Sequence, residues 1–288
     1  MAVNLTTIAR VKQFLGLDQS DSDKDDLIEF IIDGVSRQIA EHCDRTFEAT
    51  TYKQWIDGNG SRRIRLPQYP VTRLYGVAVS SQTVGTIQYT GSGKIASAEL
   101  SSSRLSLMHV TSSGVDTATD ITTAGMTVSE LSTSVNAQTG WSFSIASGKD
   151  NYAATQVRPF ASGDVVSPAD YDLEHPDNYE HARIVSETDG AIELDQGCFY
   201  DGRSNVFTWY KAGYTLPTEG DLTSGNVPKG LELVVNMIVK DIFSGASNDT
   251  GLKSEKIGDY SYTLNDGVFT EAVMRYKDEL WPWVRKGI

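Results

Sequence analysis

The stretch DKDDLIEFIIDGVSRQIAEHC (residues 23–43) decides the first large element of the fold. Carboxylates at Asp23, Asp25 and Asp26 oppose the positive end of a helix macrodipole, so a helix is predicted to begin near them and to run to about Cys43. The apolar side chains recur at helical spacing and form one broad stripe, made of Leu27, Ile28, Ile31, Ile32, Val35 and Ile39. Such a stripe must be buried against other apolar surface.

Three further helices are predicted to cover that stripe. Each has apolar residues at helical spacing, and the first two also have capping or terminating residues. Four helices can close a core that none closes alone. The expected bounds of the three are Thr6 or Thr7 to Gly16, Pro228 to just before Gly245, and about 270–283, with a polar, exposed connector at 253–262 before the last.

Between residues 46 and 80 the apolar pattern changes to a period of two, which is typical of strands. Segments 52–56 and 63–66 flank Asp57-Gly58-Asn59-Gly60, and this turn chemistry predicts a β-hairpin. Alternation and β-branched or aromatic residues predict further strands at 71–79, 191–194 and 205–210.

Residues 82–165 differ in composition, because Ser, Thr, Gly and Ala dominate and charges are sparse. Alternating stretches predict short strands, and Thr127 with Glu130 forms the capping box of one helix. We therefore expect a β-rich insert domain at 82–165, carried by a core domain made of 1–81 and 166–288. The predicted fold class is α+β, a small helical bundle of about four helices with β-hairpin and strand elements, interrupted by that insert.

Composition excludes several classes of protein. The 288 residues carry a net charge of −13, and acids exceed bases by ten within residues 166–288, so a nucleic-acid reader is a poor fit. No apolar run is long enough to cross a bilayer, and the N-terminus lacks a signal peptide, so a soluble, unexported chain is expected. Cys43 and Cys198 form no disulfide or zinc pattern, which favours a reducing compartment.

No catalytic, cofactor or metal site is predicted, so an enzyme is not expected. The sequence has no nucleophile elbow, phosphate loop or zinc-protease motif. The only candidate metal cluster holds His175 and His181 in the acidic stretch 170–181, but Pro176 interrupts it and its spacing fits no helix face. A solvated loop is the preferred interpretation. The acids at 21–26 lack the Gly and Glu of a calcium loop, and helix capping is preferred there.

Five segments occur in a characteristic order along the chain: LTTIARVKQFLG (5–16), IAEHCDRTF (39–47), LPQYPV (66–71), YKAGY (210–214) with Pro217, and LKSEKIGDYSY (252–262). In this order they resemble the motifs of the head-tail connector (adaptor, or head-completion) proteins of tailed bacteriophages. The resemblance covers 1–81 and 166–288, and the insert is longer than in compact members.

The resemblance implies a structural virion protein that is assembled in the host cytoplasm and resides in the neck of the virion. It implies a homo-oligomeric ring, expected to be a dodecamer, that binds the portal protein, meets tail or neck proteins and lets DNA pass through its lumen. An acidic channel lets DNA slide because it repels phosphates. The family further suggests that the C-terminal segment docks on the portal, with Tyr276, Leu280, Trp281 and Trp283 as candidate anchors.

Two alternatives belong to other classes of protein. The insert is a candidate carbohydrate- or host-surface-binding module, in which Tyr89, Trp141 and Tyr152 would stack on sugar rings. An enzyme, such as a hydrolase using acids between Asp170 and Asp201, is the weaker alternative, because no nucleophile motif accompanies those acids.

Overall fold

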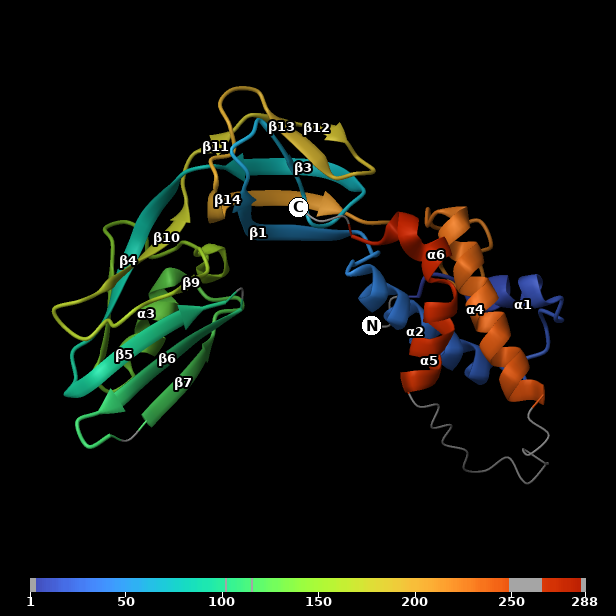
Figure 1. Ribbon diagram of the computed structural model, residues 1–288, viewed down its shortest axis with the longest axis horizontal. Coiled ribbons are helices and arrows are strands. Elements are labelled where there is room, and N and C mark those ends of the chain that lie inside the picture. The colour runs from blue at the N-terminus through green and yellow to red at the C-terminus, as the bar shows by residue number, and fades with distance from the viewer. Residues whose placement is uncertain (1–3, 102, 115, 249–265, 286–288) are drawn as a thin grey trace.

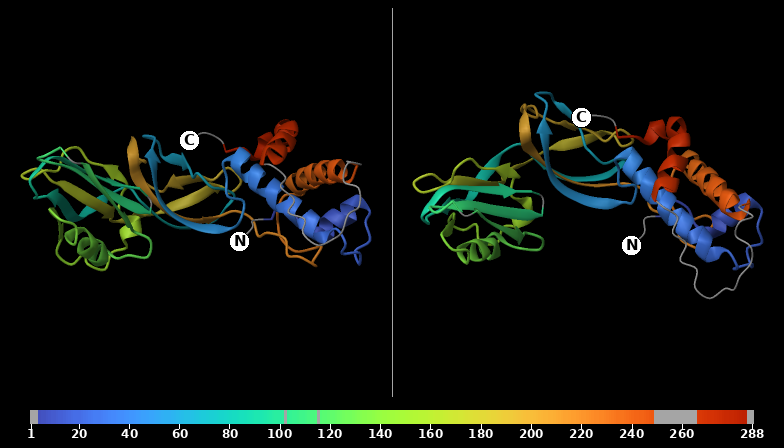
Figure 2. Two further views of the ribbon diagram at one scale, coloured as in Figure 1. Left: turned by 90° about the horizontal axis from the view of Figure 1, so that it is seen from below. Right: turned by 60° about the horizontal axis from the view of Figure 1, so that its bottom comes forward.

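The computed structural model describes residues 4–101, 103–114, 116–248 and 266–285. The chain forms three parts in a row: helices at one end, small sheets in the middle and the β-rich insert at the other end (Figure 1). Figure 2 shows the same elongated arrangement from two further directions. Each part has its own cluster of buried apolar side chains. The helical part combines segments from both ends of the chain, so its core needs residues from before and after the other two parts.

The helical part begins with α1 (Ile8–Leu15) and α2 (Asp25–Cys43). Thr7 caps α1, because its side chain accepts a hydrogen bond from the backbone N–H of Arg10 at 3.3 Å. Gly16 ends the helix in the left-handed conformation, as predicted. In α2, five members of the predicted stripe are buried and the sixth, Leu27, is partly buried. These two predicted helices are confirmed.

The C-terminal helices complete that core: α4 (Lys229–Asn248), α5 (Asp266–Arg275), α6 (Lys277–Leu280) and the 3-10 turn η2 (Trp281–Trp283). The end predicted near Gly245 is wrong, because α4 continues through this glycine. A single helix over 270–283 is also wrong, since the chain breaks at Tyr276 and thereby directs Leu280 into the helical core. The connector expected at 253–262 lies outside the described residues.

The middle part contains two antiparallel sheets. The larger has the strand order β1-β14-β3-β11, and the smaller has the order β12-β13-β2. Their apolar faces share one core with Tyr69, Val71 and Tyr210. The strands are β1 (Thr50–Gly58), β14 (Gly202–Ala212), β3 (Val71–Ala78), β11 (Tyr179–Glu180), β12 (Ala182–Ser186), β13 (Ala191–Leu194) and β2 (Arg63–Arg65).

The β-hairpin predicted around residues 57–60 is wrong. β1 pairs with β14, and β2 pairs with β13 in the other sheet, so the turn connects two sheets instead of two partners. Gly58 has a tertiary role here, because a Cβ on it would collide with the carbonyl oxygen of Tyr200. Local turn chemistry did not reveal that both partner strands come from far along the chain.

The insert contains two more antiparallel sheets, with orders β10-β4-β8 and β7-β6-β5-β9. Its helix α3 (Val128–Asn136) has the predicted capping box of Thr127 and Glu130. The core of the insert extends beyond residue 165, because Leu173 is buried in it. The strands are β4 (Ser81–Tyr89), β5 (Gly93–Leu100), β6 (Arg104–Thr111), β7 (Asp116–Thr122), β8 (Trp141–Ile145), β9 (Phe160–Ala161) and β10 (Tyr171–Pro176), with the 3-10 turn η1 (Ala154–Gln156).

The predicted fold class is wrong. The described residues are 36% strand, in four antiparallel sheets, and 28% helix, so they form a β-rich fold with a few helices and not a small helical bundle. The strong 3.6-residue periodicity of the helices dominated the sequence pattern, whereas many strands are short and carry few apolar residues each. Among the described residues, no helix is both long and apolar enough to span a bilayer.

Candidate functional site

The four predicted anchors of the C-terminal segment lie in different environments. Leu280 is fully buried in the helical core, and Tyr276 and Trp283 pack partly against the same core. Trp281, by contrast, is 74% exposed. The four residues therefore do not form one surface, and Trp281 alone among them presents most of its side chain to solvent.

Tyr276, which precedes α6, links the start of this helix to α4 through a side-chain hydrogen bond. Its hydroxyl donates a hydrogen bond to Oδ2 of Asp241 at 2.8 Å. Desolvation of the phenol, followed by this hydrogen bond and the negative charge of Asp241, raises the pKa of Tyr276 to about 12. The phenol therefore stays neutral at physiological pH and remains a donor.

Arg45 joins the C-terminal segment to the middle part. The side chain is 5% exposed, and its guanidinium donates to the carbonyl oxygens of Trp283, at 3.0 Å, and of Tyr69. The guanidinium also lies 3.6 Å from the centroid of the Tyr69 ring. Two residues after Trp283, the backbone N–H of Arg285 donates a hydrogen bond to the backbone carbonyl oxygen of Cys43 at 2.8 Å. Residues 283–285 are thus held against the chain's own α2 and sheet.

Three of the motifs that carry the family resemblance meet at this same junction. The N–H of Tyr214 donates to Phe47 O at 2.7 Å, and the N–H of Gly213 donates to Pro70 O at 2.9 Å. The N–H of Thr46 donates to Oε1 of Gln68 at 2.9 Å. Segments 39–47, 66–71 and 210–214 therefore form one hydrogen-bonded joint. The motif at 252–262 lies outside the described residues.

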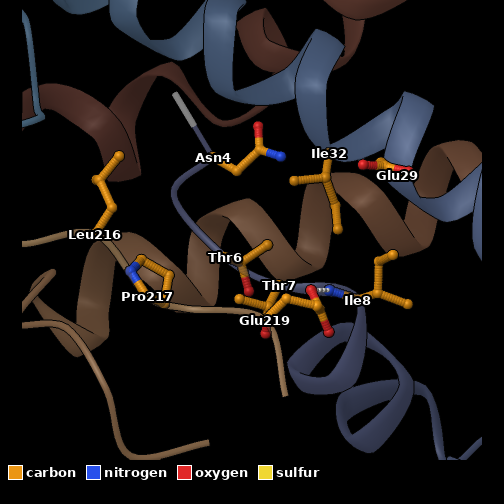
Figure 3. A pocket seen from close by; sticks show the side chains of 9 residues that line it. All are labelled: Asn4, Thr6, Thr7, Ile8, Glu29, Ile32, Leu216, Pro217 and Glu219. Carbon is orange, nitrogen blue, oxygen red and sulfur yellow. Dashed lines mark hydrogen bonds between the residues drawn. The ribbon is translucent and has the colours of Figure 1, made fainter. Parts of the chain in front are cut away.

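A small cavity of about 260 Å³ lies at the start of α1, between α2 and the loop before α4 (Figure 3). Glu219 reaches into it and accepts hydrogen bonds from the N–H groups of Ile8, at 2.8 Å, and Ala9, at 3.0 Å. The carboxylate thus satisfies N–H groups that the helix leaves open, and an external anion would have to displace it. We assign this cavity a structural role in fastening residues 215–228 to α1.

The predicted sugar-stacking residues do not form an exposed platform. Tyr89 and Trp141 are buried in the core of the insert, with their rings in an edge-to-face contact at 5.3 Å. Tyr152 packs edge-to-face on His175, with ring centroids 4.7 Å apart. Trp141 and Phe143 alternate along β8 and so lie on one face of this strand, which points inward.

A second, open hollow of about 680 Å³ lies where the insert meets β14. Phe160 and Tyr171 stack beside it with centroids 4.4 Å apart, and Arg158 pairs with Glu174 at 2.5 Å. Arg158 also donates to Arg203 O at 2.8 Å, so it bridges the insert and the middle part. Arg158 is thus paired with Glu174 inside the insert and bonded to a backbone carbonyl of the middle part, which indicates a structural joint.

The solvated loop predicted over 170–181 is wrong for its first half, because residues 171–176 form β10. His175 is buried, and its Nδ1 lies 3.1 Å from Pro176 O. Burial, with a smaller contribution from the charge of Lys149, lowers the pKa of His175, against the opposing effect of Pro176 O. Among the described residues, no three His, Cys, Asp or Glu side chains are placed to hold a metal.

One surface of the middle part was not predicted from the sequence. On the larger sheet of the middle part, Lys53, Arg73, Tyr75, Trp209 and Lys211 form an aromatic-basic face. Lys53 lies opposite Trp209, and Arg73 lies opposite Lys211. The alternation within each strand was visible in the sequence, but the pairing of three distant strands that brings these residues together was not.

The sequence matches no known family and no curated protein.

Proposed function

We propose that the chain is a structural subunit of a phage neck, a head-tail connector that forms a ring below the portal and lets DNA pass. The convergence of motif segments 39–47, 66–71 and 210–214 on one hydrogen-bonded joint supports this proposal most directly. We retain a dodecamer as the expected ring size and tail or neck proteins as further partners.

The helical part offers surface for such partners. Several large apolar side chains are exposed on its helices, which is typical of protein contacts when such residues are grouped. We propose that Trp281, at 74% exposure, contacts the portal, because the other predicted anchors are partly or fully engaged in the chain's own core. Other exposed apolar residues of the helical part are Phe14, Phe30, Leu233, Val268 and Met274.

Negative-stain imaging of the purified chain, alone and mixed with portal, tests the proposal. We expect rings, either free or seated on portal, and no turnover of polysaccharide. A chain that remains monomeric and never associates with portal would refute the connector role. Hydrolysis of a polysaccharide that is lost when acids between Asp170 and Asp201 are changed would also refute it.

The contact assigned to Trp281 has its own test. Trp281→Ala removes an exposed side chain, so the thermal midpoint should change little while the affinity for portal falls by about tenfold or more. Tyr200→Ala is the matched control, because it removes a large, 62% exposed aromatic side chain outside the helical part. Unchanged portal affinity in Trp281→Ala would rule out this contact without affecting the ring proposal.

A further inference from the structure

The aromatic-basic face is built from contacts across three strands. Trp209 of β14 stacks on Tyr75 of β3, with ring centroids 5.0 Å apart and an interplanar angle of 27°. Lys53 Nζ lies 4.5 Å from the centroid of Trp209, and Arg73 Cζ lies 5.0 Å from that of Tyr75. The two rings and two cations form a continuous row across the sheet, with favourable cation-π geometry.

This face is a local excess of positive charge on an acidic protein. Lys53, Arg73 and Lys211 are exposed, and within the described residues none of them is in an ion pair. Strands β3 and β14 contain no acidic residue, whereas the whole chain has a net charge of −13. A partner surface that carries carboxylates therefore complements this face.

The geometry favours an acidic protein surface over a nucleic acid. Single-stranded nucleic acids bind by stacking bases on open aromatic faces. Here the faces of Trp209 and Tyr75 already contact each other, Lys53 and Arg73. The surface thus offers ring edges, alkyl stems and cationic heads, which suit carboxylates on another protein.

The chain itself carries a matching acidic surface at the start of α2. Asp21, Asp23 and Asp26 are exposed, and within the described residues none of them is in an ion pair. Asp25, beside them, already pairs with Lys12 at 2.5 Å. The connection between α1 and α2 lies at the far end of the helical part, away from the sheet (Figure 1). One molecule therefore presents the two complementary patches at separate places.

We propose that the aromatic-basic face docks onto the acidic start of α2 of a second copy of this chain. Two different patches in one contact make a heterologous interface, which continues from copy to copy and closes into a ring when the rotation allows. Such an interface also explains how copies that each carry an excess of negative charge associate. The inference rests on the ring assembly proposed above and assigns surfaces to it.

Neutralising variants of the full chain test the contact. The face variant is Lys53→Gln with Arg73→Gln, and the acid variant is Asp21→Asn with Asp23→Asn. The matched control, Lys94→Gln with Arg65→Gln, removes one exposed Lys and one exposed Arg elsewhere. Sedimentation velocity at low and high ionic strength measures self-association, and negative-stain imaging with portal measures ring formation. Circular dichroism confirms that each variant is folded.

We expect the face and acid variants each to weaken assembly by about tenfold or more, while the control assembles like the wild type. Wild-type assembly should weaken with added salt. A mixture of the face and acid variants should stop at one-to-one dimers, because each variant retains only one working patch.

Three results overturn the inference. If the face variant assembles like the wild type, the contact is wrong while the connector role stands. If the variants assemble normally but lose binding to a DNA oligonucleotide, the face serves nucleic acid. If the mixture forms no dimers, the acidic start of α2 is not the partner. A wild type that never assembles, with or without portal, instead refutes the connector role as well.

Discussion

Arg45 is a buried cation at the boundary between the helical part and the middle part. Its guanidinium donates to the carbonyl oxygens of Tyr69 and Trp283, which belong to two distant segments. Buried carbonyls without partners are costly, so single residues of this kind determine how separate cores are joined. Cys43, next to this joint, is buried, and its desolvation raises its pKa to about 11, so the thiol is inert.

Replacing Arg45 should loosen this joint. Arg45→Met keeps the aliphatic bulk but removes the donors, so we expect the free energy of unfolding to fall by about 2 kcal/mol. Urea denaturation followed by tryptophan fluorescence measures the loss. The exposed Arg65 supplies the control, since Arg65→Met should change the free energy by less than about 0.5 kcal/mol. Equal effects in the two variants would contradict the role of Arg45.

His175 should make the stability of the insert depend on pH. Burial lowers the pKa of His175 in the folded state below its value of about 6.5 in the unfolded chain. The unfolded state therefore binds the proton more readily. Stability is complete above about pH 6.5, falls as the pH is lowered through that value, and levels off below the folded pKa.

Urea midpoints measured across this pH range check the prediction for His175. His175→Phe should flatten the dependence, whereas His181→Gln, at an exposed position, should leave it intact. A wild-type midpoint that stays constant from about pH 8 to pH 5 would show that the imidazole does not titrate as a buried neutral group.

Helices α2 and α5 approach each other closely because α2 has a glycine at the contact. A Cβ at Gly34 would lie 2.5 Å from ring carbons Cε1 and Cζ of Phe269, which is itself 2% exposed. The glycine lowers the intrinsic helix propensity of α2, but the close packing of Phe269 compensates for it. Helix pairing here is therefore determined by one small residue within an apolar stripe.

Gly34→Ala should destabilise the helical part despite the better helix propensity of alanine. We expect a loss of about 1 to 3 kcal/mol, because the methyl group overpacks a buried ring. Thermal unfolding measures the loss, and combining the substitution with Phe269→Leu should recover part of it. Gly163→Ala is the control, since nothing lies near that position. A fully additive double variant would contradict direct contact.

The three parts of the molecule have separate buried cores. The insert meets the middle part through Trp55, whose indole N–H donates to Gln156 O at 2.9 Å, and through Arg158 on Arg203. None of the described residues between 80 and 173 belongs to the other two buried clusters. We therefore propose that the insert is a peripheral domain that the rest of the molecule can fold without.

Excision of the insert tests this proposal. Ser81 and Pro176 are cross-strand partners, so residues 82–175 can be replaced by Asn-Gly without separating their neighbours. We expect the shortened chain to unfold cooperatively and, if the connector role is right, to bind portal. Circular dichroism and calorimetry provide the measurement. A shortened chain without a cooperative transition would show that the parts share one folding unit.

Local sequence patterns predicted α1, α2 and α3, with the cap at Thr7 and the capping box at Thr127. These features involve residues within a few positions of one another, so short-range periodicity and hydrogen bonding suffice to specify them. The strands at 71–79, 191–194 and 205–210 were found for the same reason. The sequence by itself therefore determined most of the helices and several strands, but it underestimated how much of the chain is sheet.

Only the tertiary structure decided which elements are partners. β1 pairs with β14, about 150 residues away, and no local signal at Asp57-Gly58 shows this. Strand pairing and the burial of Leu280, Trp141 and His175 depend on chain segments that meet only after folding, since a side chain's environment is set by its neighbours in space. The aromatic-basic face exists for the same reason, as a product of register between strands far apart in sequence.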